Sequence, residues 1–301
     1  MTTTCLCGND HAPVGNVHIR RANPLRKDPT RTITLQKRFY REILRRAQLL
    51  QTAVIDFLVV RDVLGLKEES DLPFFLLNAG FQFNTNPARL EAFNTWFADQ
   101  VQQNLFTVDP NAPSSRPWVS EYVISAYRQG LANAYLAAHA ADLLGPGRTA
   151  ASVAEFLGSF AAPVMTDQVR LLYTRAFEEL RGVSASIAAA MSRILAQGFV
   201  DGSSPVEIAQ RMSRTIRDIS MRRGLLIART EIVRAHAEGQ LDAYQSLGIG
   251  RLGIRAEWST AGDDRVCPLC AGNEGEVFTL KKARGLIPLH PQCRCVWLPL
   301  V

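Results

Sequence analysis

Apolar residues recur at steps of three and four along most of the chain, which is the spacing of one buried helix face. The first such stretch begins at Thr34 and predicts a helix that ends near Gly65. The same spacing predicts six further helices, over Pro87–Leu105, Trp118–Leu144, Thr166–Leu180, Val183–Gln197, Ser204–Ile219 and Arg222–Leu247. Gly198 is positioned to end the fifth helix, and Ser204 with Glu207 has the spacing of a capping box that starts the next.

The hydrophobic period changes after Gly250. Leu252–Trp258 alternates between apolar and polar residues, which is typical of a strand with one buried face. Gly275–Leu280 and Cys293–Leu298 are two further short strand candidates. We therefore predict a mainly α protein, with a helical N-terminal body and a small α+β C-terminal domain of short antiparallel strands. The expected division is an extended arm at 1–30, a helical domain at 31–160 and the strand-containing domain at 161–301.

The last part of the chain contains five soft metal-ligand candidates. They lie in two similar pieces, Cys267-Pro-Leu-Cys270 and His290-Pro-Gln-Cys293-Arg-Cys295. Zinc takes four thiolate or imidazole ligands in closed structural sites, so five candidates compete for four places. We favour Cys267, Cys270, His290 and Cys293, because each Pro-containing piece then supplies two ligands. Cys295 is the substitute, since two thiols two residues apart on a strand face the same side.

Zinc at these residues would act as a structural staple. Three short strands bury too little apolar surface to be stable alone, and structural zinc contributes on the order of 10 kcal/mol of apparent binding energy to small modules. Cys5, Cys7, His11 and His18 form a weaker second candidate, because their spacing fits no standard zinc knuckle. A disulfide framework is not expected, because nothing in the sequence indicates export.

Composition and charge narrow the function classes. Hydrophobic residues make up 47% and charged residues 21% of the 301 residues, as in soluble globular proteins. No uncharged apolar run is long enough for a membrane span, and the N-terminus lacks a secretory leader, so we expect no membrane partner and a reducing cytoplasm. Ten basic and three acidic residues among the first 50 give this segment a net charge of +7, so it holds the whole excess of a chain whose net charge is +6. Such an arm can bind DNA or an acidic protein, or be a solvated tail.

The order of several motifs resembles one known family. Arg229-Thr-Glu231 on a predicted helix precedes Trp258-Ser-Thr-Ala-Gly-Asp-Asp264-Arg265-Val-Cys267, Gly275 and the His290-Pro-Gln-Cys-Arg-Cys295 piece. Over residues 165–300 this resembles the head morphogenesis domain of phage Mu F-like minor head proteins. The resemblance implies a non-enzymatic virion protein near the portal vertex, made in the host bacterial cytoplasm. It implies the portal protein, a major capsid or scaffolding protein and double-stranded DNA as candidate partners.

The same residues also have simpler, purely structural interpretations. Arg229 and Glu231 lie two apart on a helix, so we expect each to pair with a different neighbour. Asp263 and Asp264 precede the first Cys pair, where carboxylates accept backbone N–H bonds. Arg294 is expected to point away from a metal, toward DNA, a partner carboxylate or an internal acid.

Three rival functions use the same segment. A zinc deaminase is suggested by His236-Ala-Glu238 before the Cys267–Cys270 pair, although His236 falls within a predicted helix and the proline lies inside the pair. A zinc nuclease would need His290 free for catalysis. A zinc-held DNA-binding module would use the basic residues Lys281, Lys282 and Arg284.

Overall fold

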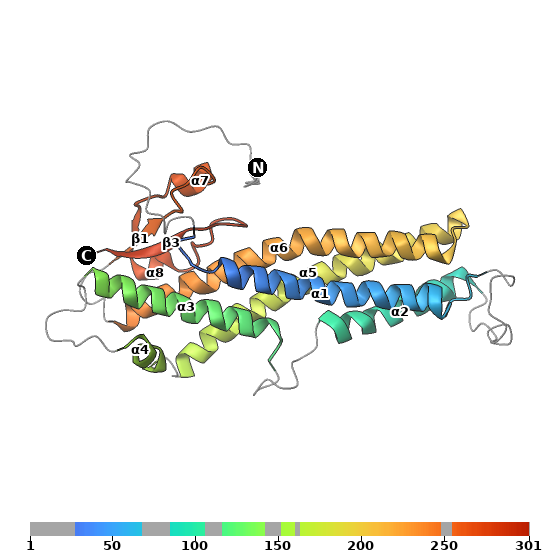
Figure 1. The fold of residues 1–301 in the computed structure, drawn as a ribbon, viewed down its shortest axis with the longest axis horizontal. Coiled ribbons are helices and arrows are strands. Elements are labelled where there is room, and N and C mark those ends of the chain that lie inside the picture. Colours follow the sequence, from blue (N-terminus) through green and yellow to red (C-terminus); the bar gives the residue numbers. More distant parts are fainter. Residues whose placement is uncertain are drawn as a thin grey trace. The chain divides into compact units, whose positions relative to one another are not determined.

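The chain is mainly helical, with a small sheet near its C-terminus (Figure 1). The computed structural model describes residues 28–67, 85–105, 116–141, 152–159, 163–247 and 255–300. The long elements are α1 Ile33–Ile55, the π-helix η2 Asp56–Val60, α2 Asn86–Leu105, α3 Val119–Ala140, α4 Val153–Ser159, α5 Pro163–Asp201 and α6 Pro205–Ser246. They are followed by β1 Arg255–Ser259, α7 Pro268–Ala271, β2 Val277–Phe278, α8 Leu280–Ala283 and β3 Val296–Leu300. The predicted fold class is confirmed at this level.

Two pairs of predicted helices are in fact single helices. Thr166–Leu180 and Val183–Gln197 are joined in α5, and the two segments from Ser204 onward are joined in α6. The C-cap prediction for Gly198 was wrong, because α5 continues to Asp201. A Cβ at Gly198 would lie 2.6 Å from the Ile208 side chain, so glycine permits close packing of α5 on α6. The capping box is confirmed by Ser204 N donating to Glu207 Oε2 at 2.9 Å. The helix predicted from Thr34 ends before Gly65: α1 ends at Ile55 and is followed directly by η2, which ends at Val60.

The three predicted strands form one antiparallel sheet with the order β2-β1-β3. Each strand is shorter than predicted or begins later, and residues 252–254 lie outside the described residues. Cys293–Cys295, predicted to lie on the last strand, instead precede β3, which begins at Val296. They follow a turn at Gln292, whose φ of 66° is left-handed. Trp258 lies opposite Trp297 in the sheet, and their rings meet edge to face at 5.4 Å.

The described structure separates into two compact units, each built from distant segments. Unit 1 contains Met1–Phe39, Val119–Ala176 and Leu226–Val301, and therefore holds α3, the last part of α6 and the sheet. Its helices α3 and α6 cross at two glycines. A Cβ on Gly130 would lie 2.0 Å from the backbone oxygen of His236, and one on Gly239 would lie 2.2 Å from that of Tyr127. Only glycine allows this approach.

Unit 2 contains Tyr40–Trp118 and Phe177–Leu225, and its core is apolar. Phe93 is fully buried and its ring lies within 6.0 Å of three other aromatic rings, those of Phe57, Trp96 and Phe97. Helices α1 and α6 pack here as well, with Gln51 Nε2 donating to the Ser213 oxygen at 3.2 Å. The unit is a helix assembly of the kind the three- and four-residue apolar spacing predicts.

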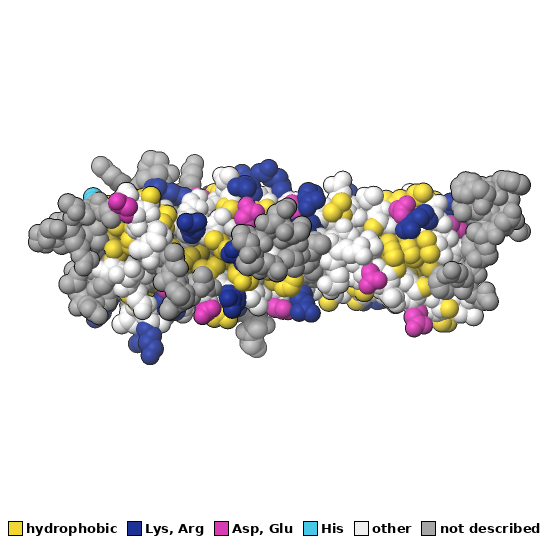
Figure 2. All heavy atoms as spheres, turned by 90° about the horizontal axis from the view of Figure 1, so that it is seen from below, with side chains coloured by type: hydrophobic (Ala, Val, Ile, Leu, Met, Phe, Trp, Pro, Cys, Tyr) yellow, Lys and Arg dark blue, Asp and Glu magenta, His cyan; other side chains and the backbone are white. Residues whose placement is uncertain are grey.

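The predicted divisions at 30 and 160 stay predictions. Residues 1–27, which contain most of the expected arm and the Cys5, Cys7, His11 and His18 group, lie outside the described residues. The remaining basic residues of the first 50 include several on α1, which is a regular helix. On the face drawn in Figure 2, basic and acidic side chains are interspersed with apolar ones. Part of the basic excess is therefore carried by a folded helix.

One described helix, α5 over Asp167–Asp201, is long and apolar enough by composition to cross a membrane. The core helices of soluble proteins share this property. In unit 2 the α5 residues Val183, Ile187 and Met191 are buried. We attach no membrane role to α5.

Candidate metal centre

The first pair of cysteines is arranged by α7. Cys267 is the N-cap of this short helix, with Pro268 at its first position, and its sulfur accepts the backbone N–H of Cys270 at 3.5 Å. Proline suits the first helical position because its missing N–H has no partner there in any helix. The helix turn brings the sulfurs of Cys267 and Cys270 to the same side.

The second piece forms a tight turn of its own. Cys293 N donates to the His290 oxygen at 3.2 Å, and the left-handed Gln292 lies between them. The His290 Nδ1 lies 2.7 Å from the Pro291 oxygen. A proton on Nδ1 donated to this carbonyl leaves Nε2 with a lone pair, which is the tautomer that a metal-binding histidine needs.

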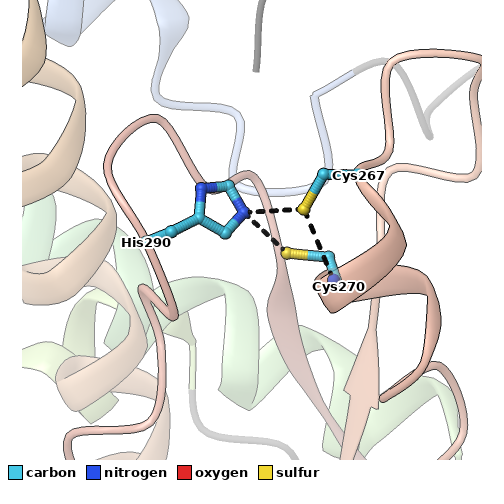
Figure 3. A group of neighbouring side chains, drawn as sticks. All are labelled: Cys267, Cys270 and His290. Atoms are coloured by element: carbon cyan, nitrogen blue, oxygen red, sulfur yellow. Dashed lines mark hydrogen bonds between the residues drawn. The ribbon is translucent and has the colours of Figure 1, made fainter. Parts of the chain in front are cut away.

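The two pieces converge, as Figure 3 shows for Cys267, Cys270 and His290. His290 Nε2 lies 3.1 Å from the Cys267 sulfur and 3.0 Å from the Cys270 sulfur. Cys270 and Cys293 have their sulfurs 3.8 Å apart. Two groups result, Cys267–Cys270–His290 and Cys270–Cys293–Cys295, each with all its ligand atoms within 4.8 Å of one another. All five predicted candidates are therefore brought together, with Cys270 in both groups.

These distances fit a small soft cation. Two thiolates bound tetrahedrally at about 2.3 Å from zinc lie about 3.8 Å apart, as Cys270 and Cys293 do. The sulfur–nitrogen distances are shorter than the roughly 3.5 Å of such a site, so the imidazole has to withdraw slightly for an ion to enter. The four cysteines of these two groups are buried, at 2% or 3% exposure. Buried thiols with one imidazole are a donor set that zinc prefers.

The thiols also influence one another without a metal. A hydrogen bond to Cys293 raises the pKa of Cys270, and burial raises it further. Hydrogen bonds from Cys270 and Cys295 lower the pKa of Cys293. Adjacent buried thiolates repel one another, so all three sulfurs can be ionised together only beside a cation.

A set of polar side chains on α6 holds the C-terminal module, which we define as residues 255–300. Gln240 brackets one residue of β3: its Nε2 donates to the Trp297 oxygen at 3.0 Å and its Oε1 accepts the Trp297 N–H at 3.1 Å. Tyr244 donates to the same carbonyl at 3.1 Å. The edge of β3 is thereby covered by side chains of α6 instead of by another strand.

A second part of this contact is ionic. Arg284 donates to Glu238 Oε2 at 3.0 Å and to Asp242 Oδ1 at 2.5 Å. Gly285 N donates to Glu238 Oε1 at 2.8 Å, and the Tyr127 hydroxyl of α3 donates to Asp242 Oδ2 at 2.6 Å. All four carboxylate oxygens have a donor, which is what burial of two acids requires.

Most of this surface of α6 was not predicted from the sequence. Glu238, Gln240 and Asp242 are at most 8% exposed, although polar side chains of these types are usually found in solvent. The one available signal was polar residues at alternating positions in a helix whose apolar face was otherwise complete. Such a pattern does not reveal which backbone groups the polar side chains bind.

Several single-residue expectations can be compared with the structure. Arg229 donates to Gln292 and Glu231 pairs with Arg175 and Arg234, so the expectation of different neighbours is confirmed. Among the partners left open for Arg294, it takes an internal acid, with two hydrogen bonds to Asp263 at 2.7 and 2.5 Å. Asp263 also accepts the backbone N–H of Arg265, as expected for this turn.

The residues of the rival functions lie in other contacts. His236 is fully buried with Nε2 2.9 Å from Asn133 Nδ2, and burial lowers its pKa to about 3. Glu238 is bound to Arg284, and neither residue belongs to a metal-ligand group among the described residues. His290 lies among the thiols instead of standing apart. Of the three proposed DNA-binding residues, Lys281 and Lys282 are exposed, but Arg284 is engaged with α6.

Comparison with known proteins gives one match. No curated protein and no solved structure matches the chain. The family described as phage Mu protein F like protein matches residues 190–298, about a third of the chain. This stretch begins within α5 and includes α6 and all five metal-ligand candidates. The resemblance expected from the motifs is therefore confirmed: residues 190–298 match the phage Mu protein F like family.

Proposed function

We propose that this chain is a minor head protein of a tailed bacteriophage, made in the host cytoplasm and incorporated into the virion. The observation that carries this proposal is the family match, which covers both α6 and the converging Cys and His residues that α6 helps to hold. The mainly helical architecture agrees with a structural role in head morphogenesis. Its partners are then the portal protein and the major capsid or scaffolding protein.

The C-terminal module is proposed to hold one structural zinc ion. Cys267, Cys270, His290 and Cys293 are the preferred ligands, because each of the two turns supplies two of them and the Cys270 sulfur lies close to both His290 and Cys293. Cys295 is the substitute ligand. Four protein ligands leave no position for a water molecule, so such an ion stabilises the fold and does not activate water.

Contact with the portal or with DNA is proposed for the N-terminal part of the chain. Lys37, Arg41 and Arg45 are exposed and follow one another at four-residue steps, so they share one face of α1. A row of cations can neutralise successive phosphates or face an acidic protein surface. Salt-sensitive binding to duplex DNA would support DNA as the partner of this row.

The test is co-purification with the portal protein of the same phage. Deleting residues 1–50 is unsuitable, because it removes the buried residues Ile43, Ala47 and Leu50 of the unit 2 core. Deletion of residues 1–27 and charge reversal at Lys37, Arg41 and Arg45 leave the core intact. We expect the full chain to be retained on the portal oligomer and the variants to be released at lower salt. Failure of the full chain to bind portal or capsid proteins would contradict the proposal.

The role is proposed to be non-enzymatic. The buried, paired state of His236 and Glu238 supports this proposal against the deaminase. Deaminase or nuclease turnover by the purified zinc-loaded chain, abolished by Glu238→Ala or His290→Ala, would overturn it. Binding of DNA without turnover would support a binding role.

A further inference from the structure

Three arginines lie next to the proposed zinc ligands. Arg265 is two residues before Cys267, and Arg294 lies between Cys293 and Cys295. Arg229 comes from α6 and reaches the second turn, where its Nη1 lies 2.5 Å from Gln292 Oε1, one residue before Cys293. The Thr230 hydroxyl oxygen lies 3.5 Å from Gln292 N, which holds the same turn against α6.

The arginines differ in the charge of their partners. Arg265 and Arg294 both donate to the carboxylate of Asp263, at 3.1 Å and at 2.7 and 2.5 Å. The hydrogen-bond partner of Arg229 is a neutral amide oxygen. Burial lowers the pKa of Arg229, and the positive charges of Arg294 and Arg265 lower it further. The guanidinium of Arg229 is therefore partly desolvated beside two like charges.

The thiolates of the proposed zinc site can supply the negative charge that the partner of Arg229 lacks. A divalent ion bound by three thiolates and one neutral imidazole leaves one net negative charge on the centre. The geometry places both arginines beside the sulfur-bearing turn, because Arg294 lies between Cys293 and Cys295 and Arg229 is bonded to Gln292, the residue before Cys293. A partly buried charge gains most from an opposite charge nearby, because screening by water is reduced.

We infer that Arg229 is a positioning residue of the metal centre, whose guanidinium balances the net negative charge of the thiolate-bound ion. This inference rests on the zinc site proposed above. It assigns opposite effects to the two states of the protein: Arg229 stabilises the metal-bound form and is repelled by Arg265 and Arg294 in the metal-free form. A residue that only clasps the turn would stabilise both forms.

The test uses the full chain and two measurements. Zinc affinity is measured by competition with a chelator, and the stability of the metal-free chain by urea unfolding. Arg229→Met removes the charge, Arg229→Lys keeps it, and Gln292→Ala keeps the charge but removes the hydrogen bond. Arg222→Met is the matched control, because Arg222 is an exposed arginine of the same helix that bonds to its own helix backbone.

Arg229→Met is expected to weaken zinc binding about tenfold, the usual effect of losing a group that supports metal ligands. Its metal-free form should unfold at the same or a higher urea concentration than the metal-free wild type. Arg229→Lys, Gln292→Ala and Arg222→Met should each stay within about threefold of the wild-type zinc affinity, well short of that loss.

Two results would overturn the inference while leaving the zinc site in place. One is an equal loss of stability in the metal-free and zinc-bound forms of Arg229→Met. The other is a loss of zinc affinity in Gln292→Ala that matches Arg229→Met, which would make the contact a mechanical clasp. If the wild type binds no zinc, the metal centre fails and the inference fails with it.

Discussion

Unit 2 and the C-terminal module of unit 1 are stabilised by different interactions. In unit 2 the interior is made of apolar side chains such as Leu50, Phe93 and Ile216, all fully buried. The module has a small apolar centre around Trp258 and Trp297, and its contacts with α6 are polar. A helix assembly of this size buries enough apolar surface for stability, whereas a three-stranded sheet with strands of two to five residues does not.

The two regions also differ in how strictly each residue is specified. Apolar packing tolerates many sequences of suitable volume. Buried polar groups tolerate few, because each must meet a partner at a defined place. The module is therefore the region in which single residues have individual roles, and it is also the region with the candidate metal ligands.

The largest effect is expected from removing the candidate ligand that the two groups share. Cys270→Ser eliminates the sulfur common to both ligand groups, and we expect loss of bound zinc and local unfolding of residues 255–300, since structural zinc contributes on the order of 10 kcal/mol to small modules. Elemental analysis and hydrogen exchange measure the two effects. Cys295→Ser is the control and should retain zinc. Retention of zinc by Cys270→Ser would contradict the ligand set.

Unit 2 should respond instead to loss of apolar volume. Phe93→Ala removes a fully buried ring from the aromatic group and should lower the free energy of unfolding by about 4 kcal/mol. Urea unfolding followed by helical circular dichroism checks this value. Zinc content should be unchanged, and a variant that also lost zinc would show that the two regions are not independently stabilised.

The glycine crossing in unit 1 offers a matched pair of substitutions. Gly239→Ala places a methyl group 2.2 Å from the Tyr127 oxygen and should cost about 3 kcal/mol, because α3 and α6 must move apart. Gly182→Ala, on α5, meets no atom within 4 Å and should stabilise by about 0.5 kcal/mol through higher helix propensity. Thermal unfolding measures both, and equal effects would argue against the close crossing.

Loss of the two hydrogen bonds between Gln240 and Trp297 should lower the free energy of unfolding by a smaller amount. Gln240→Ala leaves the buried N–H and C=O of Trp297 without the Gln240 amide, and unsatisfied groups of this kind cost about 2 kcal/mol. Gln210→Ala, at an exposed position of the same helix, is the control and should be neutral. Hydrogen exchange of the Trp297 amide should rise only in the first variant.

The smallest expected effect depends on pH. Hydrogen bonds from Arg294 lower the pKa of Asp263 from 3.8 to about 2, so its carboxylate stabilises the folded state above about pH 4. This contribution is lost as the pH falls toward 2. Asp263→Asn should lower stability by about 1 kcal/mol at pH 7, given partial solvent screening, and by almost nothing at pH 2. A pH-independent difference would contradict this role.

Local patterns were sufficient to predict the fold class and the five Cys and His residues that the structure brings together. Three- and four-residue apolar spacing identifies helices because it reflects a local repeat, and the paired Cys267–Cys270 and His290–Cys293 pieces identify candidate metal ligands because each pair is joined by a short turn. The family resemblance followed from the order of these motifs. Each of these signals lies within a short stretch of chain.

The points at which helices continue and the burial of polar residues depend on contacts between distant segments. Gly198 was read as a helix end because glycine usually ends helices, but its partner Ile208 lies on the following helix. The burial of Gln240 and Glu238 could not be predicted, because their partners, Trp297 and Arg284, are more than forty residues away. Contacts between distant segments leave no periodic trace in the sequence, and they are what fixes the module against α6.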